Sequence, residues 1–151
     1  MSFELRGVCA LLQVFDMPAS LAFYRDILGF TIVGSAPPLE RGDDFGWVWL
    51  RRDTAELMLN TRYDPDAVRP PAPDSASVAA HDDTILYIGC PDVDAVYEHL
   101  RAHGIAVSAP TIAPYGMRQL YVKDPDGFGL CFQWSTEAKD APAREREIRA
   151  L

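Results

Sequence analysis

Residues 16–30 read DMPASLAFYRDILGF, which is an aspartate, an amphipathic helical stretch, a glycine and a further apolar residue. The same arrangement returns about 76 residues later, where residues 92–105 read DVDAVYEHLRAHGI. Each stretch follows a short apolar run, at 8–14 and 85–90, and each precedes three further strand candidates. A solenoid would repeat at a shorter period, so this spacing predicts a duplicated βαβββ module. We therefore expect an α+β fold whose two modules form a curved mixed sheet around a concave cavity.

The first repeat carries clear helix boundary signals. Asp16 is a suitable N-cap, and Pro18 falls in the first turn, where its missing N–H costs nothing. Gly29 is expected to end the helix as a C-cap. The apolar stripe of this helix comprises Leu21, Tyr24, Ile27 and Leu28. The expected strands are 8–14, 31–34, 45–51, 55–59, 85–90, 119–123 and 129–134, the last two joined by a tight turn at 124–127.

The pattern divides the chain into four parts. Residues 1–60 form the first βαβββ module and residues 84–135 form the second. Residues 61–83 are rich in proline and are expected to be a linker, either merely mobile or a flap over the site. Residues 136–151 are a charged tail that forms a short solvent-facing helix or has no fixed structure.

The composition narrows the classes of function. The chain has 151 residues, 48% of them hydrophobic, which suffices for one domain or two small modules sharing a core. A net charge of −8 disfavours nucleic acid and is compatible with a cationic ligand or with ordinary solubility. The sequence shows neither a signal peptide pattern nor an apolar run of about 18 residues, so we expect no membrane partner. The three cysteines, without disulfide spacing, predict a cytoplasmic protein.

Alternation along the strands predicts which side chains face away from the helices. In the first strand, the even-numbered residues from Val8 to Val14 are expected to pack on the helix. The opposite face is aromatic and amide-bearing with one carboxylate, which is too polar for a core and too aromatic for a plain solvent face. Such a surface suits a planar or cationic organic ligand or, alternatively, a partner subunit. The predicted ligand-binding residues are Gln13, Trp47, Trp49, Glu56, Met58, Tyr87, Gln119 and Tyr121.

These motifs resemble the vicinal oxygen chelate superfamily, which includes glyoxalase I, bleomycin-resistance proteins, fosfomycin-resistance proteins and extradiol dioxygenases. The resemblance rests on the paired modules, on residues 16–30, and on YGMR at 115–118 followed by DPDG at 124–127. It covers about residues 5–135 and is specific for the fold rather than for an activity. The family's metal enzymes carry ligands near the start of the first and fifth strands and late in the fourth and eighth. This resemblance implies, in this chain, the positions Cys9, Glu56, Ile85 (or Thr84) and Cys131.

Only one of these implied positions carries a usual ligand. The family's enzymes place His, Glu or Gln there, and this chain matches only at Glu56. Cys9, Glu56 and Cys131 would suit a zinc ion with an open fourth position. The alternative is two small buried thiols and a lone acid, and we therefore expect no cofactor, with a divalent metal as the alternative. His99 and His103 are expected to be exposed residues near a helix end.

The sequence supports three hypotheses for the function. The first is a metal-free binding protein, nearest to the bleomycin-resistance branch, that sequesters an aromatic or cationic small molecule. The second is a metal-dependent lyase, isomerase or transferase with an atypical Cys9, Glu56 and Cys131 site. The third is a non-catalytic interaction domain whose aromatic face is buried in a dimer. A homodimer is expected in keeping with the resemblance, and the modules could pair within one chain or swap between two.

Overall fold

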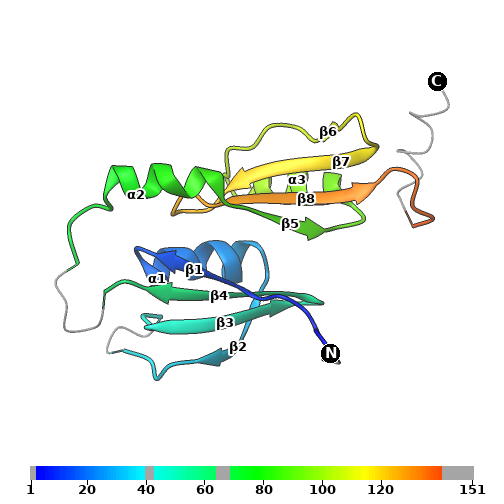
Figure 1. The fold of residues 1–151 in the computed structure, drawn as a ribbon. Coiled ribbons are helices and arrows are strands. Elements are labelled where there is room, and N and C mark those ends of the chain that lie inside the picture. Colours follow the sequence, from blue (N-terminus) through cyan, green and yellow to red (C-terminus); the bar gives the residue numbers. More distant parts are fainter. Residues whose placement is uncertain (1–2, 40–42, 64–68, 141–151) are drawn as a thin grey trace. The chain divides into compact units, whose positions relative to one another are not determined.

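The computed structural model describes residues 3–39, 43–63 and 69–140. The chain divides into two compact units, Met1–Pro73 and Asp74–Leu151 (Figure 1). Within the described residues, no helix is long and apolar enough to cross a membrane. Most of the predicted charged tail, residues 141–151, lies outside the described part of the chain.

The first unit is a βαβββ module. Its elements are β1 (Ala10–Val14), α1 (Met17–Leu21), the π-helical segment η1 (Ala22–Ile27), β2 (Thr31–Ser35), β3 (Trp47–Arg52) and β4 (Ala55–Thr61). The sheet order is β1-β4-β3-β2, with β1 parallel to β4 and β3 antiparallel to both of its neighbours. This is the module that the repeat predicts.

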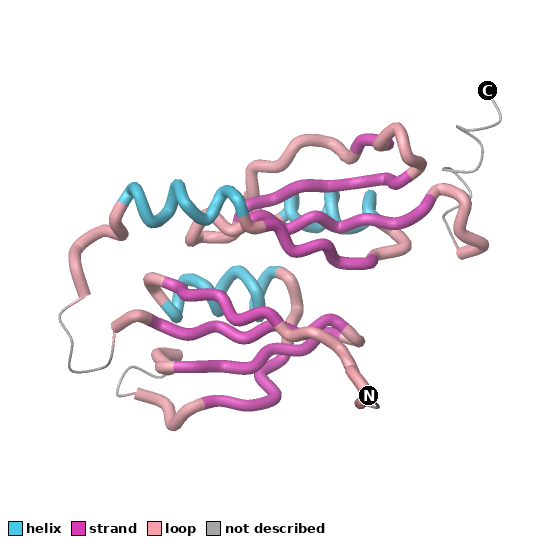
Figure 2. Tube along the Cα trace, viewed as in Figure 1, coloured by secondary structure: helices cyan, strands magenta, loops and turns pink. Residues whose placement is uncertain are grey.

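The second unit repeats this topology after an additional helix (Figures 1 and 2). Its elements are α2 (Ser75–Ala80), the 3₁₀ helix η2 (His81–Asp83), β5 (Ile85–Gly89), α3 (Val93–Ala102), β6 (Thr111–Ile112), β7 (Met117–Lys123) and β8 (Gly129–Ser135). The sheet order is β5-β8-β7-β6, with β5 parallel to β8. The α+β fold with paired βαβββ modules is therefore confirmed. Each module forms its own four-stranded mixed sheet, and the concave cavity stays a prediction.

The two module helices begin alike but differ by one residue. Asp16 and Asp92 are the N-caps, each accepting a hydrogen bond from the backbone N–H three residues later. Gly29 and Gly104 end the helical stretches with φ of 73° and 74°. The first stretch is one residue longer, because 29 − 16 is 13 and 104 − 92 is 12. A π-helical turn absorbs one residue without rotating the rest of the helix, so η1 accounts for the insertion.

Each core lies between its sheet and its module helix, as strand alternation predicts. On the helix-facing side of the first sheet, Val48, Leu50 and Leu59 are fully buried. The remaining buried apolar residues of the first unit are Leu12, Val14, Met17, Leu21, Phe23, Tyr24, Leu28, Phe30 and Leu57. Those of the second unit are Val93, Leu100, Leu120, Val122, Phe128, Leu130 and Phe132, while Cys131 is buried on the opposite face of its sheet.

The start of the first strand was predicted wrongly. β1 begins at Ala10 rather than at Val8, and Val8 is 97% exposed instead of packing on the helix. The parallel ladder begins with the pair Ala10 and Leu57, close to where β4 leaves its tight turn with β3. Residue 8 therefore lies beyond the paired part of the sheet, and alternation has no meaning there.

A helix that the sequence pattern did not predict lies within residues 61–83. Asp74 caps α2, its Oδ2 accepting from the Ser77 N–H at 2.9 Å, while the proline-rich residues 70–73 are irregular. At η2, the His81 ring stacks on Phe128 with centroids 3.9 Å apart, and its Nδ1 lies 2.7 Å from the Asp126 carbonyl oxygen. These contacts seat α2 and η2 on the β7–β8 turn of the second unit.

Candidate functional site

The open face of the first sheet carries the predicted site residues of that unit in adjacent rows. Parallel pairing of β1 with β4 places Gln13 beside Asn60, and antiparallel pairing of β3 with β4 places Trp47 beside Asn60 and Trp49 beside Met58. These side chains are half-buried, whereas their alternate neighbours on the same strands are buried. The Asn60 amide also donates to Gln13 Oε1 at 3.1 Å. The predicted alternation of the three strands is therefore correct from Ala10 onward.

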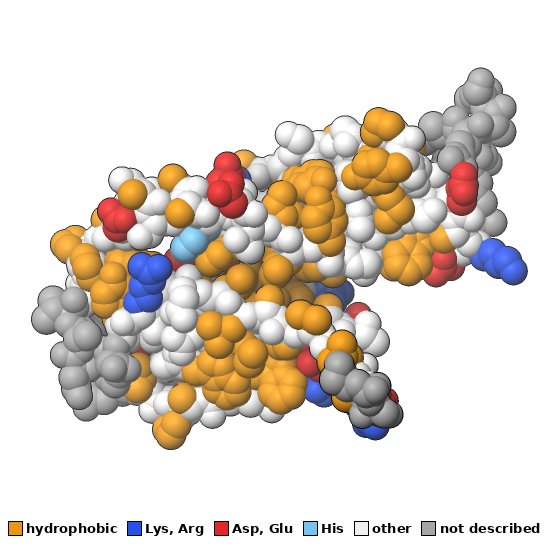
Figure 3. Space-filling view, viewed as in Figure 1, with side chains coloured by type: hydrophobic (Ala, Val, Ile, Leu, Met, Phe, Trp, Pro, Cys, Tyr) orange, Lys and Arg blue, Asp and Glu red, His pale blue; other side chains and the backbone are white. Residues whose placement is uncertain are grey.

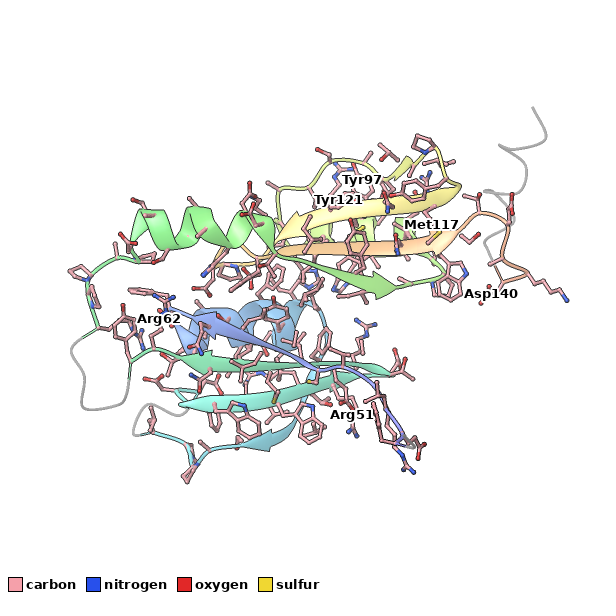
Figure 4. All side chains as sticks on the ribbon, viewed as in Figure 1. Arg51, Arg62, Tyr97, Met117, Tyr121 and Asp140 are labelled. Atoms are coloured by element: carbon pink, nitrogen blue, oxygen red, sulfur yellow. The ribbon has the colours of Figure 1, made fainter. Side chains whose placement is uncertain are left out.

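The two tryptophans of β3 lie over a glycine of the edge strand. A Cβ at Gly34 would stand 3.6 Å from Trp49 Cε3 and 3.7 Å from Trp47 Cη2. Above the Trp49 ring, the Arg51 guanidinium carbon lies 5.6 Å from the ring centroid. The Trp49 Nε1 atom is buried and has no hydrogen-bond partner within the described residues. Both indoles thus pack over Gly34, and the Arg51 side chain, labelled in Figure 4, places a cation above the Trp49 ring.

The Glu56 carboxylate accepts a hydrogen bond from Arg51, a contact that the sequence pattern does not predict. Arg51 Nε donates to Glu56 Oε1 at 2.6 Å across the β3–β4 pair. Their side chains are 45% and 28% exposed, so the pair is partly screened by solvent. Burial raises the pKa of the Cys9 thiol above its ordinary value, and the negative charge of Glu56 raises it further. This corner of the face is close to neutral, with a protonated thiol.

The open face of the second sheet is built around one cross-strand row. Pairing of β5, β8 and β7 places Cys131 between Tyr87 and Tyr121. The two rings meet edge to face with centroids 6.5 Å apart and are 54% and 45% exposed, while Cys131 is fully buried. Hydrophobic side chains gather over β7 and β8 on this face (Figure 3), and α3 contacts the same two strands from the other side.

A hydrogen-bonded network joins the tyrosines of this face to two amides. The Tyr87 and Tyr121 hydroxyl oxygens lie 3.4 Å apart, and Tyr121 donates to Gln119 Oε1 at 3.3 Å. Gln119 Nε2 donates to Gln133 Oε1 at 2.8 Å and to the Tyr115 hydroxyl at 3.0 Å. The hydrogen bond with Tyr87, then burial, raises the pKa of Tyr121 above its ordinary value.

Two members of this network were absent from the predicted site. Tyr115 precedes β7, where alternation gives no guidance. Gln133 lies two residues after Cys131 on β8, and so on the same face, but is not among the predicted ligand-binding residues. Arg118, near them in sequence, turns the other way, its Nε and Nη2 donating to the Asp94 carboxylate at 2.7 and 2.8 Å. Arg118 therefore secures α3 to the sheet and does not extend the network.

The positions that the family resemblance implies for a metal do not form a suitable donor set. A metal displaces the proton of a coordinating thiol, and burial raises the pKa of the Cys9 and Cys131 thiols, which adds to the cost of that displacement. Arg51 already holds Glu56, and Ile85 has no donor atom. Over residues 3–39, 43–63 and 69–140, no group of three or more His, Cys, Asp or Glu side chains is arranged to hold a metal ion. We therefore derive no chemistry through a metal at these residues.

The exposed histidines lie on the module helix of the second unit. His99 and His103 are exposed near the end of α3, with ring centroids 4.3 Å apart. The His103 Nδ1 atom lies 2.8 Å from the His99 carbonyl oxygen, in the last turn of the helix. Their predicted place as exposed residues at the helix end is confirmed.

Solved structures share this fold over most of the chain. The bleomycin resistance determinant encoded on transposon Tn5 is 22% identical with a TM-score of 0.65, covering 87% of this chain and 98% of its own. Lactoylglutathione lyase from Agrobacterium tumefaciens is 21% identical with a TM-score of 0.61, covering 86% and 94%. At these identities the likeness shows the fold alone.

Sequence comparison identifies the family. The uncharacterized protein YaeR of Escherichia coli strain K12 is 28% identical over 116 residues, which is 76% of this chain and 84% of that protein. The sequence profile of the Glyoxalase/Bleomycin resistance protein/Dioxygenase superfamily matches residues 8–132. This chain belongs to that superfamily.

Proposed function

We propose that this protein binds a small planar aromatic molecule, neutral or cationic, and sequesters it without using a metal. The observation that carries the proposal is the pair of half-buried indoles, Trp47 and Trp49, on the open face of the first sheet. Aromatic side chains on such a face cost solubility unless something planar or apolar covers them. Stacking on an indole is favourable for an aromatic ring and, through the ring quadrupole, for a cation.

The polar groups around the indoles favour a ligand that stacks on the rings over a ligand that forms an ion pair with a carboxylate. Glu56 was expected to supply the charge for a cation, but its carboxylate already accepts from Arg51. A cationic ligand would therefore be drawn mainly by the net charge of −8 and would compete with Arg51 for the Trp49 ring. The amides of Gln13 and Asn60, beside the indoles, offer polar contacts at the edge of a ring.

The metal-free state is part of the proposal, supported by the donor chemistry at Cys9, Glu56 and Cys131. Elemental analysis of protein purified without a chelator or a histidine tag tests it. We expect less than stoichiometric zinc, iron, nickel and manganese, unchanged after incubation with divalent ions. About one metal per chain, removed by Cys9→Ser and by Cys131→Ser, would instead support the atypical metal enzyme. The cytoplasmic location belongs to the proposal too, and it rests on three cysteines without disulfide spacing.

Fluorescence of the first-sheet face provides the direct binding test. The chain has three tryptophans, and the third, Trp134, donates its indole N–H to Asp140 in the second unit. Trp134→Phe therefore leaves only Trp47 and Trp49 to report. Titration with quinoline and with N-methylquinolinium should quench this emission and raise the melting temperature, as ligands of the folded state do. Absence of quenching and of stabilisation by either compound at millimolar concentration would contradict the proposal.

The same residues distinguish ligand binding from a dimer interface. The homodimer belongs to the proposal, and its surface is tested separately with the double variant Trp47→Ala/Trp49→Ala. We expect this variant to lose quinolinium binding, as measured by the melting temperature. Its mass by light scattering should stay that of the wild type. A change to monomer without a change in ligand response would assign the indoles to the interface instead.

A further inference from the structure

The hydrogen-bonded network on the second sheet is exposed enough to meet a ligand. Tyr87, Tyr121 and Tyr115 are 54%, 45% and 68% exposed, and Gln133 is half-buried. Buried networks of this kind normally stabilise a core, but only the Gln119 side chain of this one is buried. A chain of hydroxyls and amides laid along an open aromatic face has instead the composition of a ligand-binding surface, which needs a few fixed polar groups among rings.

Proton counting shows which groups the two ends of this network leave available. Tyr121 lies within hydrogen-bond distance of Gln119 Oε1 and of the Tyr87 hydroxyl, and either tyrosine can be the donor in the bond between the two hydroxyls. In both arrangements the Tyr87 oxygen keeps a lone pair that can accept a hydrogen bond from a ligand. At the other end, Gln133 Oε1 accepts from Gln119, which leaves the Gln133 amide N–H groups without a partner among the described residues.

The two ends of the network therefore match opposite hydrogen-bonding groups on a ligand. Tyr87 can accept a hydrogen bond, and Gln133 can donate one. Reversing both amides would exchange the two roles, so in either state a matching ligand needs a donor for one end and an acceptor for the other. Pairing of β5 with β8 sets Tyr87 opposite Cys131, two residues before Gln133, so the two ends of the network lie on adjacent strands.

We infer that this network, Tyr87–Tyr121–Gln119–Gln133 with Tyr115, selects aromatic ligands that carry a hydrogen-bond donor at one end and a carbonyl or carboxylate acceptor at the other. Hydroxy- and amino-substituted aromatic amides and acids have this arrangement. The inference rests on the proposed function, because it starts from an aromatic ligand, and it concerns the second sheet alone. It adds a selection rule that ring stacking alone does not provide.

Three matched probes test this rule. 4-Hydroxybenzamide has both groups, benzamide lacks the hydroxyl, and phenol lacks the amide. Affinity is measured by NMR, following the side-chain amide signals of Gln119 and Gln133. Since one neutral hydrogen bond is worth about 1 kcal/mol, 4-hydroxybenzamide should bind about three- to tenfold more tightly than either of the others.

Three variants then show which end of the network contacts which group of the ligand. Tyr87→Phe should remove the advantage over benzamide and keep the advantage over phenol, and Tyr87→Phe/Tyr121→Phe removes the next acceptor along the network as well. Gln133→Leu should do the reverse. Tyr97→Phe is the matched control, because Tyr97 lies on α3 beside Arg101, whose guanidinium carbon is 5.4 Å from its ring centroid. This control should leave all three affinities unchanged.

The outcomes separate this inference from the proposed function. Equal affinity for the three probes, or variants that weaken all three alike, would overturn the selection rule and make the network structural. If no probe binds while the quinoline compounds still quench Trp47 and Trp49, the proposed function stands and the selection rule fails. If neither set binds, both fall.

Discussion

The two modules have the same topology and the same helix caps, yet differ in a helix turn and in the chemistry of the open face. The first module contains the π-helical segment η1 and presents tryptophans with an arginine–glutamate pair. The second has the regular helix α3 and presents tyrosines joined to amides. Caps, glycines and buried apolar positions are shared because they form the fold. Open-face side chains differ because the core does not depend on them.

Deleting one residue from each module helix should give the largest difference in stability between the two modules. Removing the exposed Glu98 from α3 rotates everything after it by about 100°, which turns Leu100 out of the core. Losing a buried leucine costs about 2–5 kcal/mol of unfolding free energy. Removing the exposed Ala22 from η1 should instead convert the π turn into a regular α-helix and cost about 1 kcal/mol or less.

Urea unfolding of both deletion variants measures this difference in unfolding free energy. In the native structure Tyr24 follows the site of the Ala22 deletion and Leu100 follows the site of the Glu98 deletion, and both side chains are buried. A loss for the Ala22 deletion as large as for the Glu98 deletion would show that η1 is not an inserted residue. The wider π turn would then be required for the packing of Tyr24, which is fully buried.

Glycine substitution should give the next largest loss of stability. Two glycines allow the cost of backbone conformation to be separated from the cost of close packing. Gly104 and Gly127 both have positive φ, 74° and 87°. A Cβ at Gly104 meets nothing within 4 Å, so Gly104→Ala should cost only the conformational term, about 1–2 kcal/mol. A Cβ at Gly127 would stand 3.0 Å from the Val78 carbonyl oxygen, so Gly127→Ala adds overpacking and should cost about 2–4 kcal/mol.

Melting of the two glycine variants side by side checks this expectation. The excess for Gly127 measures how firmly α2 is seated on the β7–β8 turn, because Val78 belongs to α2. Equal costs would mean that α2 moves away from the turn at no penalty.

Sequence patterns predicted the parts of this molecule that depend on local chemistry. Asp16 and Gly29 bound the first helical stretch because a cap and a left-handed residue are needed at those points whatever the surroundings. Strand alternation placed Trp47 and Trp49 on one face, since the side-chain period of a strand is fixed at two.

Other features depend on contacts between distant residues and could not be predicted in this way. The Arg51–Glu56 pair requires the register of β3 with β4, which alternation alone does not set. The helix α2 is too short to show helical periodicity, and the β7–β8 turn packs against it. The π turn could have been suspected from the one-residue difference between the repeats.

The smallest expected effect is a difference in cysteine reactivity between the open faces of the two modules. Cys9 is half-buried in the first module and Cys131 fully buried in the second, so iodoacetamide should modify Cys9 and spare Cys131 until the protein unfolds. A Cys90→Ser background removes the third thiol. Because the pKa of Cys9 is raised, its rate of alkylation should reach half its maximum at a higher pH than that of a free thiol.

Variants of the charge pair should move this pH midpoint in opposite directions. Glu56→Gln removes the like charge and lowers the Cys9 pKa, whereas Arg51→Met leaves the charge of Glu56 without its cation and raises that pKa further. Burial is the larger cause of the shift, so each variant should change the rate at a fixed pH by less than about tenfold, which corresponds to one pKa unit. Shifts of the same sign in both variants would mean that they act by loosening the strand pair and admitting water to Cys9. In that case Glu56 and Arg51 would be structural partners of the first face, and its neutrality would have no bearing on which ligand it accepts.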